Sequence, residues 1–178
     1  MEYAVRGAVV ARAEEIKASL AKDPSSYPFD KTIACNIGNP QALEQQPISF
    51  VRDVLSCVVN QRLIGSDIIP KDAQERAKHY LSYVPSMGAY TESKGMLPVR
   101  MDIASFLEKR DGGVPADVEN IFLTSGASAG VQLLMTVLMR AGDGILAPKP
   151  QYPIYSALST LLGSPLKPSY LGEAHQWA

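Results

Sequence analysis

The second half of the chain alternates between short apolar runs and helix-length segments, and this alternation most limits how the chain can fold. Apolar runs at 120–124, 144–147 and 166–171 have the length of buried strands, and helices are predicted between them at 131–140 and 154–162. Short connections from strand to helix to strand imply parallel strands with helices packed on the sheet. The predicted fold class of this half is therefore α/β.

The first half predicts four helices separated by irregular, proline-rich stretches. Each helix is recognised by an apolar stripe with spacings of mostly three or four residues. The stripes are Val5-Val9-Ala13-Ile16-Leu20, Val51-Leu55-Val58, Ala73-Ala77-Tyr80 and Val99-Ile103-Phe106-Leu107. The polar run 74–78 is expected to lie on a helix surface.

Composition excludes several classes of protein. Seventeen basic and 18 acidic residues give a net charge of −1, which does not favour binding to nucleic acid or to an anionic membrane. No run approaches the roughly 18 apolar residues that cross a bilayer, and no secretory signal is evident. The two cysteines form no CxxC pair, which indicates a reducing compartment and no metal site.

The turn 124–130, Thr-Ser-Gly-Ala-Ser-Ala-Gly, lies between a predicted strand and a predicted helix. Backbone N–H groups at a helix start lack partners within the helix, and the helix dipole is positive there. Small residues let an anion approach this backbone, and the Ser128 hydroxyl adds a donor, so the turn is a candidate phosphate site. The alternative is a structural turn capped by Ser125 or Ser128.

The same turn spells Gly126-x-Ser128-x-Gly130, the nucleophile pattern of serine α/β-hydrolases. In that alternative Ser128 is the nucleophile, and Asp143 and His175 follow in the required chain order. No oxyanion segment of the HGGG type precedes the turn. Asp143 also lies between two glycines, where aspartate is an ordinary turn residue.

A second informative stretch is Pro148–Tyr155, whose three prolines stiffen the chain around Tyr152. It follows the second predicted strand, and parallel sheets bind ligands at the carboxyl ends of their strands. A phosphate site beside a fixed aromatic ring suits a phosphorylated planar ring. The alternative for Tyr152 is a packing role with a solvated hydroxyl.

These blocks together resemble class I/II pyridoxal-phosphate aminotransferases of fold type I, in the alanine aminotransferase branch. The resemblance extends over nearly the whole chain. Its blocks are Glu2–Gly7, Asn36–Asn39 followed by Gln45–Ile48, Arg110–Asp117, Thr124–Ser128 and Pro150–Ser156.

The resemblance implies a role for five residues. Ala127 and Ser128 would bind the phosphate of pyridoxal 5'-phosphate, and Tyr152 would stack on its ring. Gly38 would place its backbone near the substrate carboxylate. Tyr90 would reach the cofactor phosphate of a neighbouring subunit, although its loop departs from the commoner family spelling.

The resemblance also implies two regions. Residues 1–69 would form an N-terminal helical and irregular segment, and 70–178 the first part of the cofactor-binding large domain. Three strands rarely complete an α/β domain, so the chain is expected to be an amino-terminal portion of a longer enzyme.

The implied activity is transfer of an amino group from alanine to 2-oxoglutarate by a cytoplasmic homodimer, with the mitochondrion as the alternative compartment. The Schiff-base lysine would lie beyond Ala178, since none of the nine lysines stands in the family's motif. The chain alone would then be inactive, and a naturally short, non-catalytic relative is the other alternative.

Overall fold

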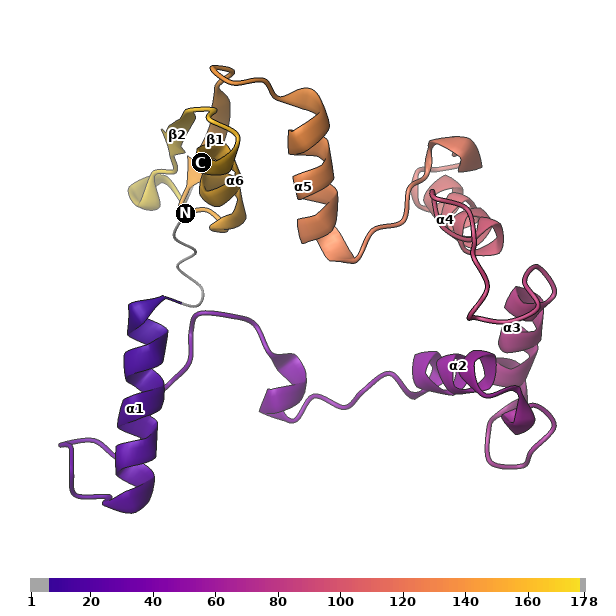
Figure 1. The fold of residues 1–178 in the computed structure, drawn as a ribbon, viewed down its shortest axis with the longest axis horizontal. Coiled ribbons are helices and arrows are strands. Elements are labelled where there is room, and N and C mark those ends of the chain that lie inside the picture. Colours follow the sequence, from indigo (N-terminus) through magenta and orange to yellow (C-terminus); the bar gives the residue numbers. More distant parts are fainter. Residues whose placement is uncertain (1–6, 177–178) are drawn as a thin grey trace. The chain divides into compact units, whose positions relative to one another are not determined.

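The computed structural model describes residues 7–176, so Val5, the Glu2–Arg6 part of the first family block and Trp177 lie outside the described residues. Figure 1 labels the principal elements along the chain. They are α1 (Ala8–Lys22), α2 (Ser49–Val59), α3 (Lys71–Leu81), α4 (Leu97–Arg110), α5 (Gly126–Leu138), β1 (Ile145–Lys149), α6 (Ile154–Leu161) and β2 (Leu166–Tyr170).

The chain divides into two compact units. One comprises the described parts of Met1–Pro40 and Ser125–Ala178, and the other is Gln41–Thr124. This division follows contacts within the chain and does not test the predicted division at residues 69 and 70, which stays a prediction.

The sequence explains where several helices begin and end. Pro98 lies in the first turn of α4, where a missing N–H removes no helical hydrogen bond. Gly112 and Gly113 follow the helix with φ values of 71° and 92°. The N–H of Gly113 donates to the carbonyl of Glu108 at 2.8 Å. Such left-handed residues let the chain turn back and satisfy the last helical carbonyls.

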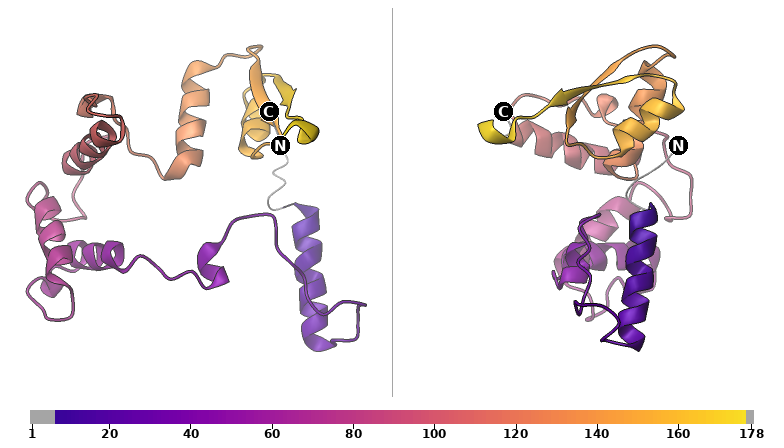
Figure 2. Two further views of the ribbon diagram at one scale, coloured as in Figure 1. Left: turned by 180° about the vertical axis from the view of Figure 1, so that it is seen from behind. Right: turned by 90° about the vertical axis from the view of Figure 1, so that its left-hand side faces the viewer.

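The β1–α6–β2 segment forms the small sheet of the first unit. β1 and β2 pair in parallel, from Ile145 opposite Leu166 to Lys149 opposite Tyr170. Figure 2 shows the two strands together with α6, which contacts β2. The turn before β1 is tied to the turn before β2, because Ser164 Oγ donates to the carbonyl of Arg140 at 3.0 Å. The predicted α/β class and parallel strands are therefore confirmed.

The prediction of a strand at 120–124 is wrong. A short 3₁₀ turn spans Val118–Asn120, and no strand is assigned from 121 to 124 within the described chain. A strand needs a neighbouring strand for its hydrogen bonds. Here the N–H of Leu123 instead donates to the carbonyl of Lys94, in the loop before α4, at 2.8 Å.

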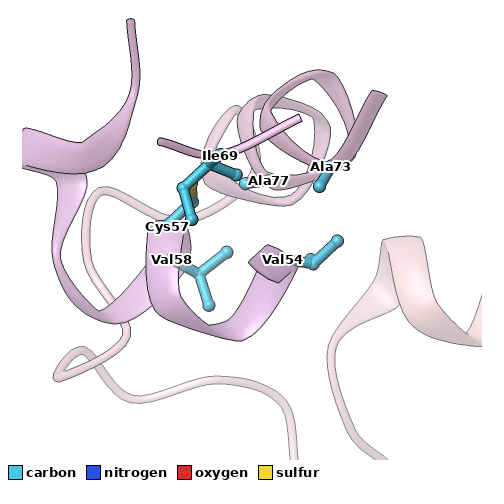
Figure 3. Packing of buried hydrophobic residues seen from close by; sticks show 6 residues of the cluster. All are labelled: Val54, Cys57, Val58, Ile69, Ala73 and Ala77. Carbon is cyan, nitrogen blue, oxygen red and sulfur yellow. The ribbon is translucent and has the colours of Figure 1, made fainter. Parts of the chain in front are cut away.

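The core of the second unit lies between α2 and α3 (Figure 3). Its buried members are Val54, Cys57, Val58, Ile69, Ala73 and Ala77. The predicted α2 stripe is therefore wrong in part, because Val51 and Leu55 are exposed while Val54 and Cys57 are buried. Ala73 and Ala77 have no side chain beyond Cβ, which allows α2 and α3 to approach closely.

The prediction that 74–78 is helix surface is wrong for Gln74, which is only 6% exposed. Its Nε2 donates to the carbonyls of Ser66 and Ile69 at 2.8 and 2.7 Å. Its Oε1 accepts the N–H of Gly65 at 2.6 Å. One amide thus satisfies three backbone groups of the loop before α3 and holds that loop against the helix.

A polar cluster joins α3 to α4. Asp102 accepts hydrogen bonds from Tyr80 Oη at 2.9 Å and from Arg76 Nη1 at 2.7 Å. Partial burial of the Tyr80 hydroxyl, followed by its hydrogen bond to Asp102, raises its pKa above the ordinary value of 10.0. The neutral phenol is therefore the form that the folded protein favours.

Replacing Gln74 by alanine is expected to lower the free energy of unfolding by about 2–4 kcal/mol, since three backbone groups lose their partner in a buried setting. Urea unfolding followed by circular dichroism measures this change. Gln61→Ala is the control, because exposed Gln61 makes one long bond, to the carbonyl of Pro85 at 3.2 Å. Equal effects of the two substitutions would contradict the assigned role of Gln74.

Because the pKa of Tyr80 is raised in the folded protein, the free energy of unfolding is expected to decrease at alkaline pH. Its stabilising contribution is complete below the pKa of an unfolded tyrosine and is lost as the pH rises through the higher folded pKa. In NMR titrations of labelled tyrosine, Asp102→Asn is expected to lower the pKa of Tyr80. Asp111→Asn, at the end of the same helix, should leave it unchanged. An unchanged Tyr80 titration in Asp102→Asn would exclude the assigned interaction.

Candidate functional site

The candidate phosphate site is the first turn of α5, which begins at Gly126 rather than at the predicted residue 131. Gly126 has a φ of +78°, a left-handed conformation that glycine adopts without strain. A Cβ at this position would meet nothing within 4 Å. The space into which a side chain at this position would project therefore holds no other described atom within contact distance.

Ala127 and Ser128 follow in this turn, and both are exposed. Within the described chain, the N-cap Ser125 makes no side-chain hydrogen bond to the turn, and the turn holds no acidic residue. The positive end of the helix dipole is therefore not neutralised by a local carboxylate of the turn. These residues fit a phosphate group, which needs backbone and hydroxyl donors at such a position.

Tyr152 lies three residues beyond the carboxyl end of β1 and directly before Pro153, the N-cap of α6. The Lys149–Pro150 peptide bond in this connection is cis. The Tyr152 side chain is 48% exposed, so it is not a core residue of the described structure. Its position at the carboxyl edge of the parallel pair agrees with the sequence prediction.

Helix α5, which contains Ser128, and helix α6, which follows Tyr152, both line one apolar cavity. Val131, one helical turn after Ser128, and Tyr155, one turn after Tyr152, both line a cavity of about 410 Å³. The remaining lining residues are Leu134, Met135, Leu138, Met139, Ile145, Leu146, Ala147 and Pro148. A lining without any charged side chain does not suit a phosphorylated ligand, so the cavity is packing space behind the candidate site.

Gly38 and Tyr90 lie on exposed, irregular chain. A Cβ at Gly38 would meet nothing within 4 Å. Tyr90 belongs to the other compact unit and borders a hollow of about 250 Å³ with Tyr83, Met96 and Leu97. The structure does not relate either residue to Ser128, so their assigned roles stay predictions.

The hydrolase alternative requires Asp143 to lie near Ser128, and the structure places it too far away. Asp143 Oδ2 accepts the N–H of Arg140 at 2.8 Å in the turn that follows α5. Ser128 lies at the other end of that helix, and the ten residues to Leu138 span about 15 Å. Asp143 is the turn residue that its glycine neighbours suggested. The side chain of His175 lies outside the described residues.

The described residues contain neither a group of metal-ligating side chains nor a membrane-spanning helix. Among the side chains that the structure describes, no three of His, Cys, Asp or Glu gather as metal ligands would. None of the described helices has the length and apolarity to cross a membrane. Of the two free cysteines, Cys57 is buried and Cys35 is exposed.

Sequence reasoning missed Arg100, a buried arginine at the start of α4. Its signal was present in the spacing, because Arg100 precedes Ile103 by three residues and Leu107 by seven. It therefore lies on the stripe that was expected to face inward. Phe106, placed on that stripe, is 63% exposed, and this part of the prediction is wrong.

Comparison with known proteins identifies relatives along the whole chain. The family model described as "Aminotransferase class I and II" matches residues 54–177. A mitochondrial alanine aminotransferase of Saccharomyces cerevisiae is 44% identical, over 99% of this chain and 32% of that protein. An inactive alanine aminotransferase of the same yeast is 42% identical, over 99% of this chain and 37% of that protein.

A solved alanine aminotransferase from Pyrococcus furiosus has a similar fold, with a TM-score of 0.68 at 24% identity. The similarity covers 99% of this chain and 36% of the solved one. The chain thus spans about a third of the length of the curated relatives that it matches.

The separation of Ser128 from Asp143 predicts that Ser128 is not an activated nucleophile. Treatment with a fluorophosphonate is expected to leave Ser128 unlabelled, as judged by peptide mass spectrometry. An active serine hydrolase in the same reaction serves as the positive control. A covalent adduct on Ser128 that disappears in Ser128→Ala would restore the hydrolase alternative.

Proposed function

The chain belongs to the class I and II aminotransferases, a family that uses pyridoxal 5'-phosphate, and we propose that its 178 residues supply part of the binding site for this cofactor. The observation that carries the proposal is the solvent-exposed first turn of α5. Gly126 has a positive φ there, and Ala127 and Ser128, which follow it in the turn, are exposed. The fit is chemical, because a dianionic phosphate needs several donors and a positive dipole.

Each residue has a distinct task in this proposal. The N–H of Ala127 and the hydroxyl of Ser128 bind the phosphate and anchor the cofactor. Tyr152, beyond the carboxyl end of β1, stacks its ring on the pyridine and limits tilting. When bound, the cofactor supplies the electron sink of amino-group transfer. The backbone of Gly38 lies near the substrate carboxylate.

We propose alanine as the amino donor, in line with the relatives named alanine aminotransferases, and 2-oxoglutarate as the acceptor. Transamination also needs a lysine that forms the Schiff base, a carboxylate beside the pyridine nitrogen and an arginine for the substrate carboxylate. We assign none of these three groups to the 178 residues. On their own these residues would not catalyse the reaction.

The complete enzyme would act as a homodimer in which Tyr90 reaches the phosphate site of the partner. The substrates are small molecules, and no nucleic acid or membrane partner is proposed. A cytoplasmic location stays a prediction, since several similar proteins are named as mitochondrial.

A non-catalytic relative is the second candidate, and one observation favours it. The relative that is 42% identical is named an inactive alanine aminotransferase. Formation of pyruvate from alanine and 2-oxoglutarate by the complete gene product distinguishes the candidates. Cofactor binding without pyruvate formation would support the non-catalytic one.

Replacing Ser128 by alanine in the complete gene product is expected to weaken pyridoxal 5'-phosphate binding by about 1–3 kcal/mol, because a donor to a charged phosphate is lost. Equilibrium titration followed by visible absorbance measures the dissociation constant. Ser125→Ala is the matched control, since Ser125 makes no cap hydrogen bond to the turn within the described chain. Unchanged affinity in Ser128→Ala would count against the phosphate assignment.

A further inference from the structure

Arg100 places a buried positive charge at the start of α4. It is 3% exposed, and no other charged side chain in residues 7–176 is buried to this degree. Its Nε donates to the carbonyl of Gly95 at 2.9 Å, and its Nη1 donates to the carbonyl of Val118 at 2.8 Å. Burial of a guanidinium is tolerated only where its donors meet good acceptors, so these two bonds determine where both carbonyls lie.

The two carbonyls belong to different segments of the chain. Gly95 ends the loop between α3 and α4, which carries Tyr90. Val118 begins the segment that runs through Thr124 into the first turn of α5. One side chain therefore joins the loop that carries Tyr90, which is assigned to the partner's phosphate site, to the segment that leads to Ser128, which is assigned to this chain's own phosphate site.

Further contacts join the same two segments. The N–H of Leu123 donates to the carbonyl of Lys94 at 2.8 Å. Lys94 Nζ donates to the carbonyl and to the Oε2 of Glu119, at 2.7 and 2.8 Å. Glu119 Oε1 also lies 3.4 Å from Arg100 Nη1, which places a carboxylate between the two cations.

Gly95 makes this close approach possible. Its φ is +103°, and a Cβ at this position would overlap the Leu123 side chain. Both observations require glycine here, because any other residue would be strained and would push the segments apart. We name Lys94, Gly95, Arg100, Val118, Glu119 and Leu123 together the Arg100 junction.

We propose that Arg100 is a positioning residue that holds the Tyr90 loop and the chain leading to Ser128 in one fixed register. The inference rests on the proposed function, which assigns Tyr90 to the partner's phosphate site and Ser128 to the phosphate site of the same chain. Leu123 precedes Ala127 by four residues, which span at most about 14 Å. The junction therefore fixes the chain only a few residues before the phosphate turn begins.

Hydrogen exchange on the complete gene product tests the physical link. Arg100→Met removes the charge and the donors but keeps an unbranched side chain. It is expected to increase the rate of amide exchange in both 84–95 and 118–124 by at least about tenfold. This factor corresponds to the loss of one hydrogen bond to a charged group. Exchange in α2 and α3 should stay unchanged. Arg110→Met is the matched control, because Arg110 is exposed on the same helix and pairs only with Asp111 among the described residues.

Cofactor selectivity separates positioning from general destabilisation. Pyridoxal lacks the phosphate, so misplacement of the phosphate-binding segments should weaken binding of pyridoxal 5'-phosphate several-fold and leave pyridoxal binding unchanged. Arg100→Lys keeps the charge but offers a point donor in place of a planar fork, and it should restore part of the selectivity. If Arg100→Met also increases amide exchange in α2 and α3, the whole unit is destabilised. The exchange rates and the cofactor selectivity are then judged from Arg100→Lys instead.

The outcomes are distinguishable. If amide exchange in Arg100→Met becomes faster in only one of the two segments, or in neither, Arg100 does not join them. Unchanged phosphate selectivity in both variants would overturn the positioning role while leaving the proposed function intact. If the unmodified protein does not prefer pyridoxal 5'-phosphate to pyridoxal, the proposed function fails. In that case the exchange data alone still decide whether Arg100 joins the two segments.

Discussion

The parallel hydrogen-bond ladder between β1 and β2 is the interaction on which the candidate site depends. Parallel strands require a crossover, and α6 supplies it with an N-terminus directly beyond the carboxyl end of β1. Tyr152 lies in that short connection, so its place at the sheet edge follows from the ladder. The turns before the two strands are joined through Ser164 and Arg140, which helps to fix the register of pairing. The observed register sets Lys149 against Tyr170, and the ladder therefore ends where the connection to Tyr152 begins.

The second constraint on the structure is the apolar surface that α5 leaves exposed to solvent. Leu133, Leu134, Val137 and Leu138 of α5 are between 50% and 72% exposed, although α5 contacts α6. An amphipathic helix normally buries its apolar stripe, and α5 is apolar on nearly all sides. The cavity of about 410 Å³ beside α5 is the space that such side chains would line in a filled core. This exposure agrees with a chain that spans about a third of the length of its curated relatives.

Buried polar side chains give the second unit its specific arrangement. Gln74 satisfies three backbone groups of one loop, whereas Arg100 joins carbonyls from two separate segments. The apolar core between α2 and α3 is composed of small and medium residues, and such cores tolerate many packings. Hydrogen bonds to buried amide and guanidinium groups are directional, so they exclude most of those packings.

Residue spacing and the conformational preferences of proline and glycine predicted the parallel α/β arrangement and the principal helices with their boundaries, because these signals act within a few positions of the chain. The family was identified separately, from the resemblance of whole motifs that include Ser128 and Tyr152. Three-dimensional packing was needed to show that 121–124 pairs with a loop rather than a strand, that α2 buries Val54 instead of Val51, and that Gln74 and Arg100 are buried. Each of these outcomes depends on which distant segment supplies the hydrogen-bond partner or the facing surface, and periodicity along one segment contains no information about its neighbour.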